Sequence, residues 1–177
     1  MQNKLSDNEQ YNPAEDTFFL DDHIKGEKGE FALDIGSGSG YLTQVLEKSF
    51  RFVVGTDINY SVLKNQTYKS QNLVCCNGAD AINLKFDLII CNLPYLATDD
   101  IIDVATDGGP QGMDIPLKII KSAIPCLSDS GKFFFITSSL SNYQGLIDAT
   151  KDLGLDTSII AKKKLFFEEL ILVEAKK

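Results

Sequence analysis

Apolar residues along the chain gather in short runs that alternate with segments of helical periodicity. The runs, which are typical of buried strands, cover residues 31–35, 51–57, 72–76, 86–91 and 132–137. Helical patterns lie at 14–20, 41–48, 60–69, about 114–127 and 141–152. Strands that alternate with helices are typical of a parallel sheet covered by helices, so the pattern predicts an α/β fold.

The last part of the chain breaks this alternation. Two further strand-like runs, 157–161 and 165–174, are separated only by Lys162, Lys163 and Lys164. No crossover helix fits between them, so we expect an antiparallel hairpin with the three lysines in its turn.

The organisation of the chain indicates one domain. With 177 residues, no internal repeat and no low-complexity linker, the sequence predicts a single domain over residues 11–177. Residues 1–10 are polar, and we expect them to form a mobile N-terminus. One long irregular segment, 94–113, interrupts the pattern, and loops of this length usually carry function or move.

The charge balance narrows the classes of partner. Seventeen Lys and Arg against 25 Asp and Glu give a net charge of −8, with an isoelectric point near 4.6. This balance argues against broad contact with a nucleic acid backbone. No apolar run approaches the roughly 18 residues that span a bilayer, and the first ten residues hold no signal-peptide core. We therefore expect a cytoplasmic protein that stays out of the membrane.

The metal-ligating side chains are few and scattered. Cys75, Cys76, Cys91 and Cys126 show no CxxC spacing, and His23 is the single histidine. This inventory predicts no metal site within the chain. We expect reduced cysteines in the core, Cys91 among them, and His23 on the solvent face of the first helix.

A glycine-rich turn follows the first strand. Gly36 and Gly38 allow the backbone to turn tightly and to approach a ligand at the N-terminus of the next helix. Asp57 ends the second strand 21 residues after Gly36, where a carboxylate can accept hydrogen bonds from both ribose hydroxyls. These features predict a nucleotide-like cofactor, either a nicotinamide dinucleotide or S-adenosylmethionine.

Two further acidic residues favour S-adenosylmethionine. Asp34, two residues before the first glycine, would repel a phosphate but can meet an ammonium group. Asp80, after the third strand, can accept a hydrogen bond from the adenine amino group, although a helix N-cap explains it equally well.

The segment after the fourth strand carries the predicted chemistry. An amide or exocyclic amine nitrogen is a poor nucleophile because its lone pair is delocalised. Two acceptors aimed at its protons would favour the pyramidal form: the Asn92 side-chain oxygen and the Leu93 carbonyl, which Pro94 holds in an extended backbone. Tyr95 offers a flat face for a planar group. Alignment and fixed dipoles would then drive transfer without a basic side chain.

With these motifs in place, the chain resembles the HemK-type class I S-adenosylmethionine-dependent methyltransferases. It resembles most closely their short archaeal and eukaryotic branch, the release factor glutamine N5-methyltransferases, which act on the Gly-Gly-Gln motif. The similar segments are 11–18, 34–40, 55–59, 92–95 and 107–112. Bacterial members add an N-terminal helical substrate domain, for which this sequence is too short. The implied fold is Rossmann-like, a seven-stranded, mostly parallel sheet in the order 3-2-1-4-5-7-6 with a C-terminal antiparallel hairpin.

The resemblance also implies a role for each site residue. The residues around the methionine part, the ribose and the adenine of S-adenosylmethionine would be Thr17, Asp34, Gly36, Gly38, Asp57, Asp80, Ala81 and Asn92. The residues that grip the substrate amide would be Asn92, Leu93, Pro94 and Tyr95. Leu93 replaces the proline that is commoner in the family, but only its backbone carbonyl is needed.

The class of substrate needs a separate argument, because adenine-N6 methyltransferases of DNA and RNA use a similar motif. Residues 92–115 contain five aspartates and no Lys or Arg. Such a loop repels nucleic acid and attracts a basic loop of a protein. The leading prediction is therefore methylation of the glutamine in the Gly-Gly-Gln motif of a peptide chain release factor. An adenine-N6 methyltransferase, a nicotinamide dehydrogenase and a non-catalytic cofactor-binding scaffold remain the alternatives.

The resemblance to the short branch also implies a partner, because enzymes of this kind pair with a small zinc-binding activator protein, often through an added edge strand. Residues 73–76 would form such an edge, with few charges to protect it. We therefore expect a heterodimer.

Overall fold

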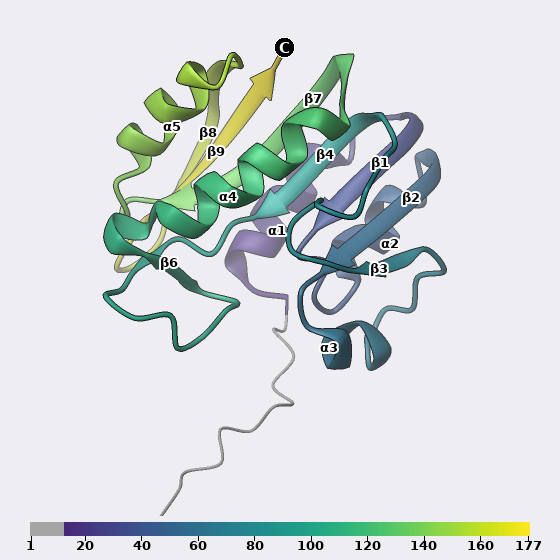
Figure 1. Cartoon of the computed structure of the whole chain (residues 1–177), viewed down its shortest axis with the longest axis horizontal. Coiled ribbons are helices and arrows are strands. Elements are labelled where there is room, and N and C mark those ends of the chain that lie inside the picture. Colours follow the sequence, from purple (N-terminus) through teal and green to yellow (C-terminus); the bar gives the residue numbers. More distant parts are fainter. Residues whose placement is uncertain (1–12) are drawn as a thin grey trace, which may run out of the picture.

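A seven-stranded sheet forms the centre of the computed structural model, which describes residues 13–177 (Figure 1). The segment predicted to be mobile, 1–10, lies outside the described residues. The strands of the sheet are β1 (Gly29–Ile35), β2 (Phe50–Asp57), β3 (Leu73–Cys75), β4 (Phe86–Asn92), β7 (Leu127–Ser138), β8 (Asp156–Lys164) and β9 (Glu169–Lys176). The helices are α1 (Glu15–Ile24), α2 (Tyr41–Leu46), α3 (Tyr60–Lys64), α4 (Asp114–Ala123) and α5 (Tyr143–Asp152), with 3-10 turns at Pro110–Gly112 and Ile124–Cys126.

The predicted strand order is confirmed. The sheet runs β3-β2-β1-β4-β7-β9-β8, which is 3-2-1-4-5-7-6 when only its own strands are counted. Neighbouring strands from β3 to β7 pair in parallel, whereas β9 runs antiparallel to both β7 and β8. The labels differ from the predicted count because two short strands, β5 (Leu96–Ala97) and β6 (Asp107–Gly109), form a separate sheet.

Helices cover both faces of the sheet, so the strands are buried on both sides. Neighbouring residues of β4 point to opposite faces: Ile89 packs in the cluster that contains α4 and α5, and Ile90 in the cluster that contains α1 and α2. Figure 1 shows α4 and α5 in front of the sheet and α1 and α2 behind it. No helix among the described residues is long and apolar enough to cross a membrane.

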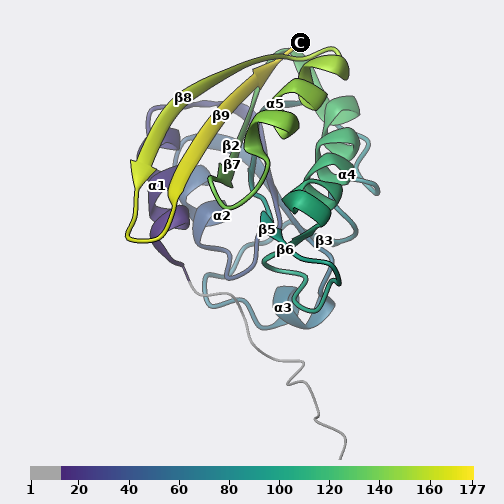
Figure 2. The same ribbon diagram turned by 90° about the vertical axis from the view of Figure 1, so that its left-hand side faces the viewer.

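The C-terminal hairpin is confirmed, but its predicted turn is wrong. Lys162, Lys163 and Lys164 belong to β8, and the turn lies at residues 165–168 (Figure 2). The lysines suggested a solvated turn because they are charged. However, β8 is an edge strand, and edge strands tolerate lysines that face solvent.

Three further expectations need correction. The segment 94–113 is not wholly irregular, because it contains the parallel pair β5 and β6. The helix expected over 60–69 ends at Lys64, since Gln66 turns inward and donates to Ser37 Oγ at 3.2 Å. Cys75 is exposed rather than in the core because β3 is the other edge strand.

The central strand β7 supplies the first test of this fold. Phe135 is fully buried between Cys91 of β4 and Val173 of β9, whereas Phe167 in the hairpin turn is 85% exposed. We expect Phe135→Ala to lower the free energy of unfolding by about 3–5 kcal/mol through the cavity that it leaves. Phe167→Ala should change it by less than about 0.5 kcal/mol. Urea unfolding of both variants checks this, and equal losses would contradict the assigned core.

Candidate functional site

The site lies where the parallel strands β1, β2 and β4 end. Ile35, the last residue of β1, pairs with Thr56 on one side and with Cys91 on the other. The next residues along the chain are Gly36, Asp57 and Asn92. They therefore meet at the carboxyl ends of the three strands. The sheet thus brings together predicted residues that lie far apart in the sequence.

The glycine turn has the predicted backbone. Gly36 and Gly38 adopt positive φ angles of 72° and 49°, which favour glycine. Among the described residues, a Cβ on Gly36 would meet nothing within 4 Å, and a Cβ on Gly38 would meet only the Gly36 carbonyl oxygen at 3.8 Å. Both residues therefore face open space in which a ligand can approach the backbone. Gly40 differs, because its Cβ would lie 2.1 Å from the Tyr68 carbonyl.

Asp57 ties the end of β2 to the glycine turn. Its Oδ2 accepts the Gly38 N–H at 3.1 Å, and its Oδ1 accepts the Asn59 N–H at 2.9 Å. Burial raises the pKa of this carboxyl above its ordinary value, although the backbone donors oppose the shift. Each carboxylate oxygen has a second lone pair and can still accept a ligand hydroxyl.

Asp34 is buried deeply beside this turn. It is 1% exposed, and its Oδ2 accepts the Thr43 hydroxyl at 2.6 Å. Burial, with a smaller contribution from the charge of Asp57, raises its pKa to about 7, although the bond from Thr43 opposes the shift. Thr43 was missing from the sequence-based site. Its spacing, three residues after Gly40 in the first turn of α2, was the only available signal.

Asn92 places an unpaired acceptor at the end of β4. Its Oδ1 is buried and has no hydrogen-bond partner among the described residues. The following Leu93 and Pro94 are also buried, so the backbone of this segment is held within the structure. Cys91 points into the core between the sheet and α4, as predicted.

Two carboxylates act electrostatically on the Tyr95 phenol. They belong to Glu168 of the hairpin turn and to Asp16 of α1. Burial is the largest cause that raises the Tyr95 pKa, followed by the charges of Glu168 and Asp16, so the phenol is neutral. Thr17 is buried next to Asp16 and donates its N–H to that carboxylate at 2.6 Å. Glu168 gave no sequence signal, because only the folded hairpin brings it here.

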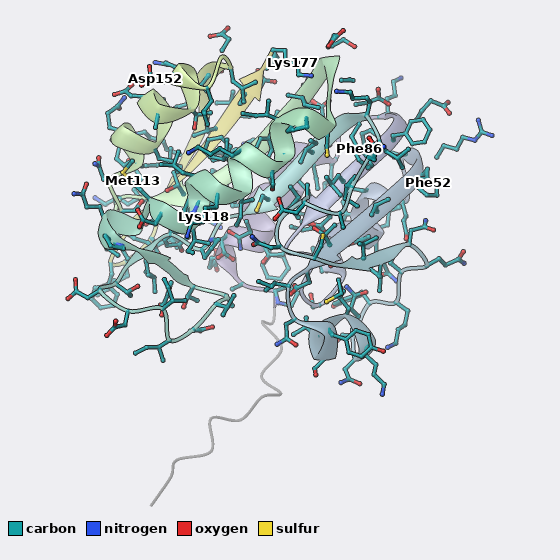
Figure 3. All side chains as sticks on the ribbon, viewed as in Figure 1. Phe52, Phe86, Met113, Lys118, Asp152 and Lys177 are labelled. Carbon is teal, nitrogen blue, oxygen red and sulfur yellow. The ribbon has the colours of Figure 1, made fainter. Side chains whose placement is uncertain are left out.

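Asp80 and Ala81 lie in the turn that follows β3. Both are exposed, and the Asp80 Oδ2 accepts the Asn77 side-chain amide at 3.4 Å. Asp80 borders a cavity of about 470 Å³ that is also lined by Lys118. Lys118 belongs to α4 and is labelled in Figure 3. None of the residues around Asp34, Asp57 and Asn92 lines this cavity.

The acidic loop is less uniformly exposed than its sequence suggests. Asp107 is buried, and its Oδ2 accepts the N–H groups of Ile102 and Asp103 at 2.8 Å each. These bonds lower the pKa of the Asp107 carboxyl. They also tie the backbone of the loop at Ile102 and Asp103 to this side chain. The other four aspartates of residues 92–115 are exposed: Asp99, Asp100, Asp103 and Asp114. His23 is half-buried, and its ring Nδ1 hydrogen-bonds with the Phe19 carbonyl at 2.8 Å, so it is not fully solvent-facing.

Comparison with solved structures gives the same fold. A chain of the E. cuniculi Mtq2–Trm112 complex, described as responsible for methylation of the translation termination factor eRF1, superimposes with a TM-score of 0.80 at 26% identity. The superposition covers 95% of this chain and 98% of that chain.

Comparison with known sequences places the chain in a family. The methyltransferase small domain family matches residues 15–166. A Methanocaldococcus jannaschii protein, described as a candidate protein N5-glutamine methyltransferase, is 33% identical and covers 94% of this chain and 91% of its own length. The methyltransferase HEMK2 of Mus musculus is 26% identical over 82% of this chain and 79% of its own length. The chain therefore belongs to the methyltransferase small domain family, among the HemK-type protein N5-glutamine methyltransferases.

Proposed function

We propose that this protein transfers the methyl group of S-adenosylmethionine to the side-chain amide nitrogen of a glutamine, the one in the Gly-Gly-Gln motif of a peptide chain release factor. The observation that carries the proposal is the Asn92 Oδ1 atom, which is buried and has no hydrogen-bond partner within residues 13–177. A buried acceptor without a donor destabilises the protein by about 1–3 kcal/mol. A substrate N–H at this atom would remove that cost, so the site favours a ligand with an N–H donor.

The mechanism follows from two acceptors and one flat surface. The Asn92 side-chain oxygen and the Leu93 carbonyl would each accept one proton of the glutamine amide, which draws the nitrogen lone pair out of conjugation. Tyr95 would pack its ring against the amide plane. Because these groups are held before the substrate arrives, they lower the barrier by alignment and fixed dipoles. The nitrogen loses its proton to water after transfer, so no side-chain base is required.

The residues around the glycine turn suit S-adenosylmethionine, which supplies an electrophilic methyl group when bound. Gly36 and Gly38 leave room for close approach of a ligand to the backbone. Asp34 would pair with the ammonium of the methionine part near Thr17, and Asp57 would accept the ribose hydroxyls. Asp80 and Ala81 would flank the adenine.

The charge of the rim supports a protein substrate over a nucleic acid. Asp99, Asp100, Asp103 and Asp114 are exposed on the segment that follows the Asn92–Tyr95 motif. Their field would repel phosphates and attract a basic protein loop. Activity on DNA or RNA adenine would therefore require these carboxylates to be screened or turned away.

We further propose that a small zinc-binding activator protein adds a strand to β3. The Asn72 carbonyl and the Cys76 N–H bond to β2, and backbone groups alternate in direction along a strand. The N–H groups of Leu73 and Cys75 therefore point to the open edge of the sheet. In this proposal residues 11–177 form the one methyltransferase domain, and the complex acts in the cytoplasm.

The first test measures label transfer from methyl-labelled S-adenosylmethionine to a release factor. We expect Asn92→Ala to lower kcat by about 10²–10³-fold, because one of the two acceptors is lost, with little change in cofactor affinity. The matched control is Asn83→Ala, because Asn83 is exposed and precedes β4, at the end of that strand opposite to Asn92. A release factor with alanine in place of the Gly-Gly-Gln glutamine should take up no label. Full activity of Asn92→Ala, or label on the alanine substrate, would refute the mechanism or the target.

Asp34 makes cofactor binding depend on pH. Its pKa of about 7 means that the carboxylate, the form that a cationic ligand prefers, is the minor form at pH 6 and the major form at pH 8. Affinity should therefore rise about tenfold from pH 6 to pH 8 and level off above the pKa. Isothermal titration calorimetry of the wild type and of Asp34→Asn checks this. The variant should bind more weakly and show no such rise.

The same raised pKa gives a readout without the cofactor. Folding favours the protonated carboxyl, so the ligand-free protein should lose stability as the pH rises from about 4 toward 7. Asp34→Asn keeps an acceptor for Thr43 and should be more stable than the wild type at pH 8. Thermal unfolding across this range would contradict the assignment if both proteins responded equally.

The activator edge is tested with two prolines. Cys75→Pro removes an N–H that points outward, whereas Val74→Pro removes one that faces β2. We expect Cys75→Pro to fold and to lose at least about tenfold in affinity for the activator. Val74→Pro should instead destabilise the sheet. Pull-down of the co-expressed activator and circular dichroism separate these effects, and undiminished binding by Cys75→Pro would exclude this edge.

A further inference from the structure

We propose that Phe166 and Phe167, in the turn between β8 and β9, form a docking surface for the protein substrate outside the pocket that holds its glutamine. The occupant is an apolar patch of the release factor that is bordered by basic side chains. The inference rests on the proposed function, because it concerns how the same site recognises the whole substrate. Two observations carry it: the exposure of both rings, and the position of the turn 165–168, here called the hairpin tip, beside the Asn92–Tyr95 motif.

The two rings of the hairpin tip are displayed to solvent. Phe166 is 91% exposed and Phe167 is 85% exposed, and their ring centroids lie 4.6 Å apart in an edge-to-face arrangement. Two phenylalanines in water forgo the free energy that burial would give them. The tip also contains none of the Gly, Pro, Asn, Asp or Ser residues that usually form turns. Neither core packing nor turn geometry therefore explains the pair, whereas exposed aromatic groups are typical of binding surfaces.

The register of the sheet places the hairpin tip at the same end as the site. β9 runs antiparallel to β7, and Leu170 near its start pairs with Ser138, the last residue of β7. The tip therefore lies at the carboxyl ends of the parallel strands, where Asn92 ends β4. Figure 2 shows the tip at the lower end of β8 and β9, the end at which β5 and β6 also lie.

The same register sets the scale of the surface. Asn92 of β4 pairs with Ile136 of β7, which pairs with Leu172 of β9, so two strand spacings, about 10 Å, separate Asn92 from Leu172. Phe167 precedes Leu172 by five residues, which span at most about 17 Å. The tip thus lies within about 30 Å of the motif that would hold the glutamine. A folded protein substrate covers this span, but a small ligand does not.

Contacts on both sides hold the hairpin tip in place. The Glu168 Oε2 accepts the Ser138 hydroxyl at 2.5 Å, and the Leu165 N–H donates to the Glu168 carbonyl at 2.7 Å. On the other side, Lys163 forms an ion pair with Glu15 at the start of α1. Because the tip is already ordered, docking avoids most of the entropic cost of ordering a loop.

The charges near the hairpin tip favour a protein over a lipid surface. Two of the three lysines of β8 are offset by carboxylates, since Lys162 pairs with Glu169 and Lys163 with Glu15. Four exposed aspartates lie on the segment after Asn92, and the chain carries a net charge of −8. This surface repels anionic lipids, and it would repel a second copy docked at the same end. A protein patch with basic side chains around apolar ones complements it.

A second aromatic pair provides the matched control. Phe31 and Phe52 lie on the neighbouring strands β1 and β2, with ring centroids 6.0 Å apart, and each is more than one-third exposed. β2 and the hairpin lie on opposite sides of the sheet centre, and Figure 3 labels Phe52 on the β2 side. Phe52→Ala therefore removes an exposed, paired ring far from the hairpin tip.

The test compares the wild type, Phe166→Ala/Phe167→Ala and Phe52→Ala, each as the full chain with its co-expressed activator. Isothermal titration calorimetry measures the Kd for an intact release factor that carries alanine in place of the Gly-Gly-Gln glutamine. We expect the double variant to raise this Kd at least about tenfold, because buried aromatic side chains dominate many interfaces. Label transfer to the normal release factor should show a matching rise in KM, with kcat within about twofold. Phe52→Ala should match the wild type.

The outcomes separate this proposal from the proposed function. An unchanged Kd in the double variant, or an equal loss in Phe52→Ala, would overturn the docking surface and leave the proposed function intact. The docking surface would also fall if the double substitution abolished binding to phosphatidylserine vesicles, or a dimer in sedimentation, without changing the Kd for the release factor. A wild type that neither binds nor methylates the release factor overturns both proposals. Urea unfolding checks that the double variant keeps wild-type stability, as expected for exposed side chains.

Discussion

The parallel pairing of β1 with β2 and β4 is the constraint on which the site depends. The carboxyl ends of parallel strands lie at the same end of the sheet, so the turns after Ile35, Asp57 and Asn92 are brought together. Helices on both faces bury the three strands and fix their register. Each side chain of the site is therefore placed by backbone pairing in the core, and only then adjusted by local hydrogen bonds.

Two polar groups at the carboxyl ends of these strands are buried in environments that are less favourable for them than water. Asn92 keeps a side-chain oxygen buried with no donor from the described part of the chain, and Asp34 keeps a carboxyl whose charged form is opposed by burial. Both arrangements destabilise the ligand-free protein, and both are relieved by groups of opposite character, an N–H donor and a cation. The chemistry of the expected ligands can thus be inferred from the two groups that are unfavourable in the ligand-free protein.

Much of this architecture could be predicted from the sequence because its signals are local. Apolar runs bounded by Gly36 or Asp57 define strands whichever fold contains them, and the strand order followed from the family resemblance. The turn of the C-terminal hairpin could not be placed, since three lysines look alike in a turn and on an edge strand. Thr43 escaped notice for a related reason. Its role arises from a contact with Asp34 that is made only after folding, and a threonine is not distinctive by itself.

The two edges of the sheet differ in a way that limits assembly. Along β8, the register shifts between Ile159 and Ala161 and lysines follow, and both features hinder a further strand. The opposite edge, β3, carries neither. A sheet with one receptive edge has a valency of one: it can take a single partner or pair with its own copy, but it cannot pass the pairing on. Strand addition in this protein therefore ends in closed pairs and does not propagate into fibres.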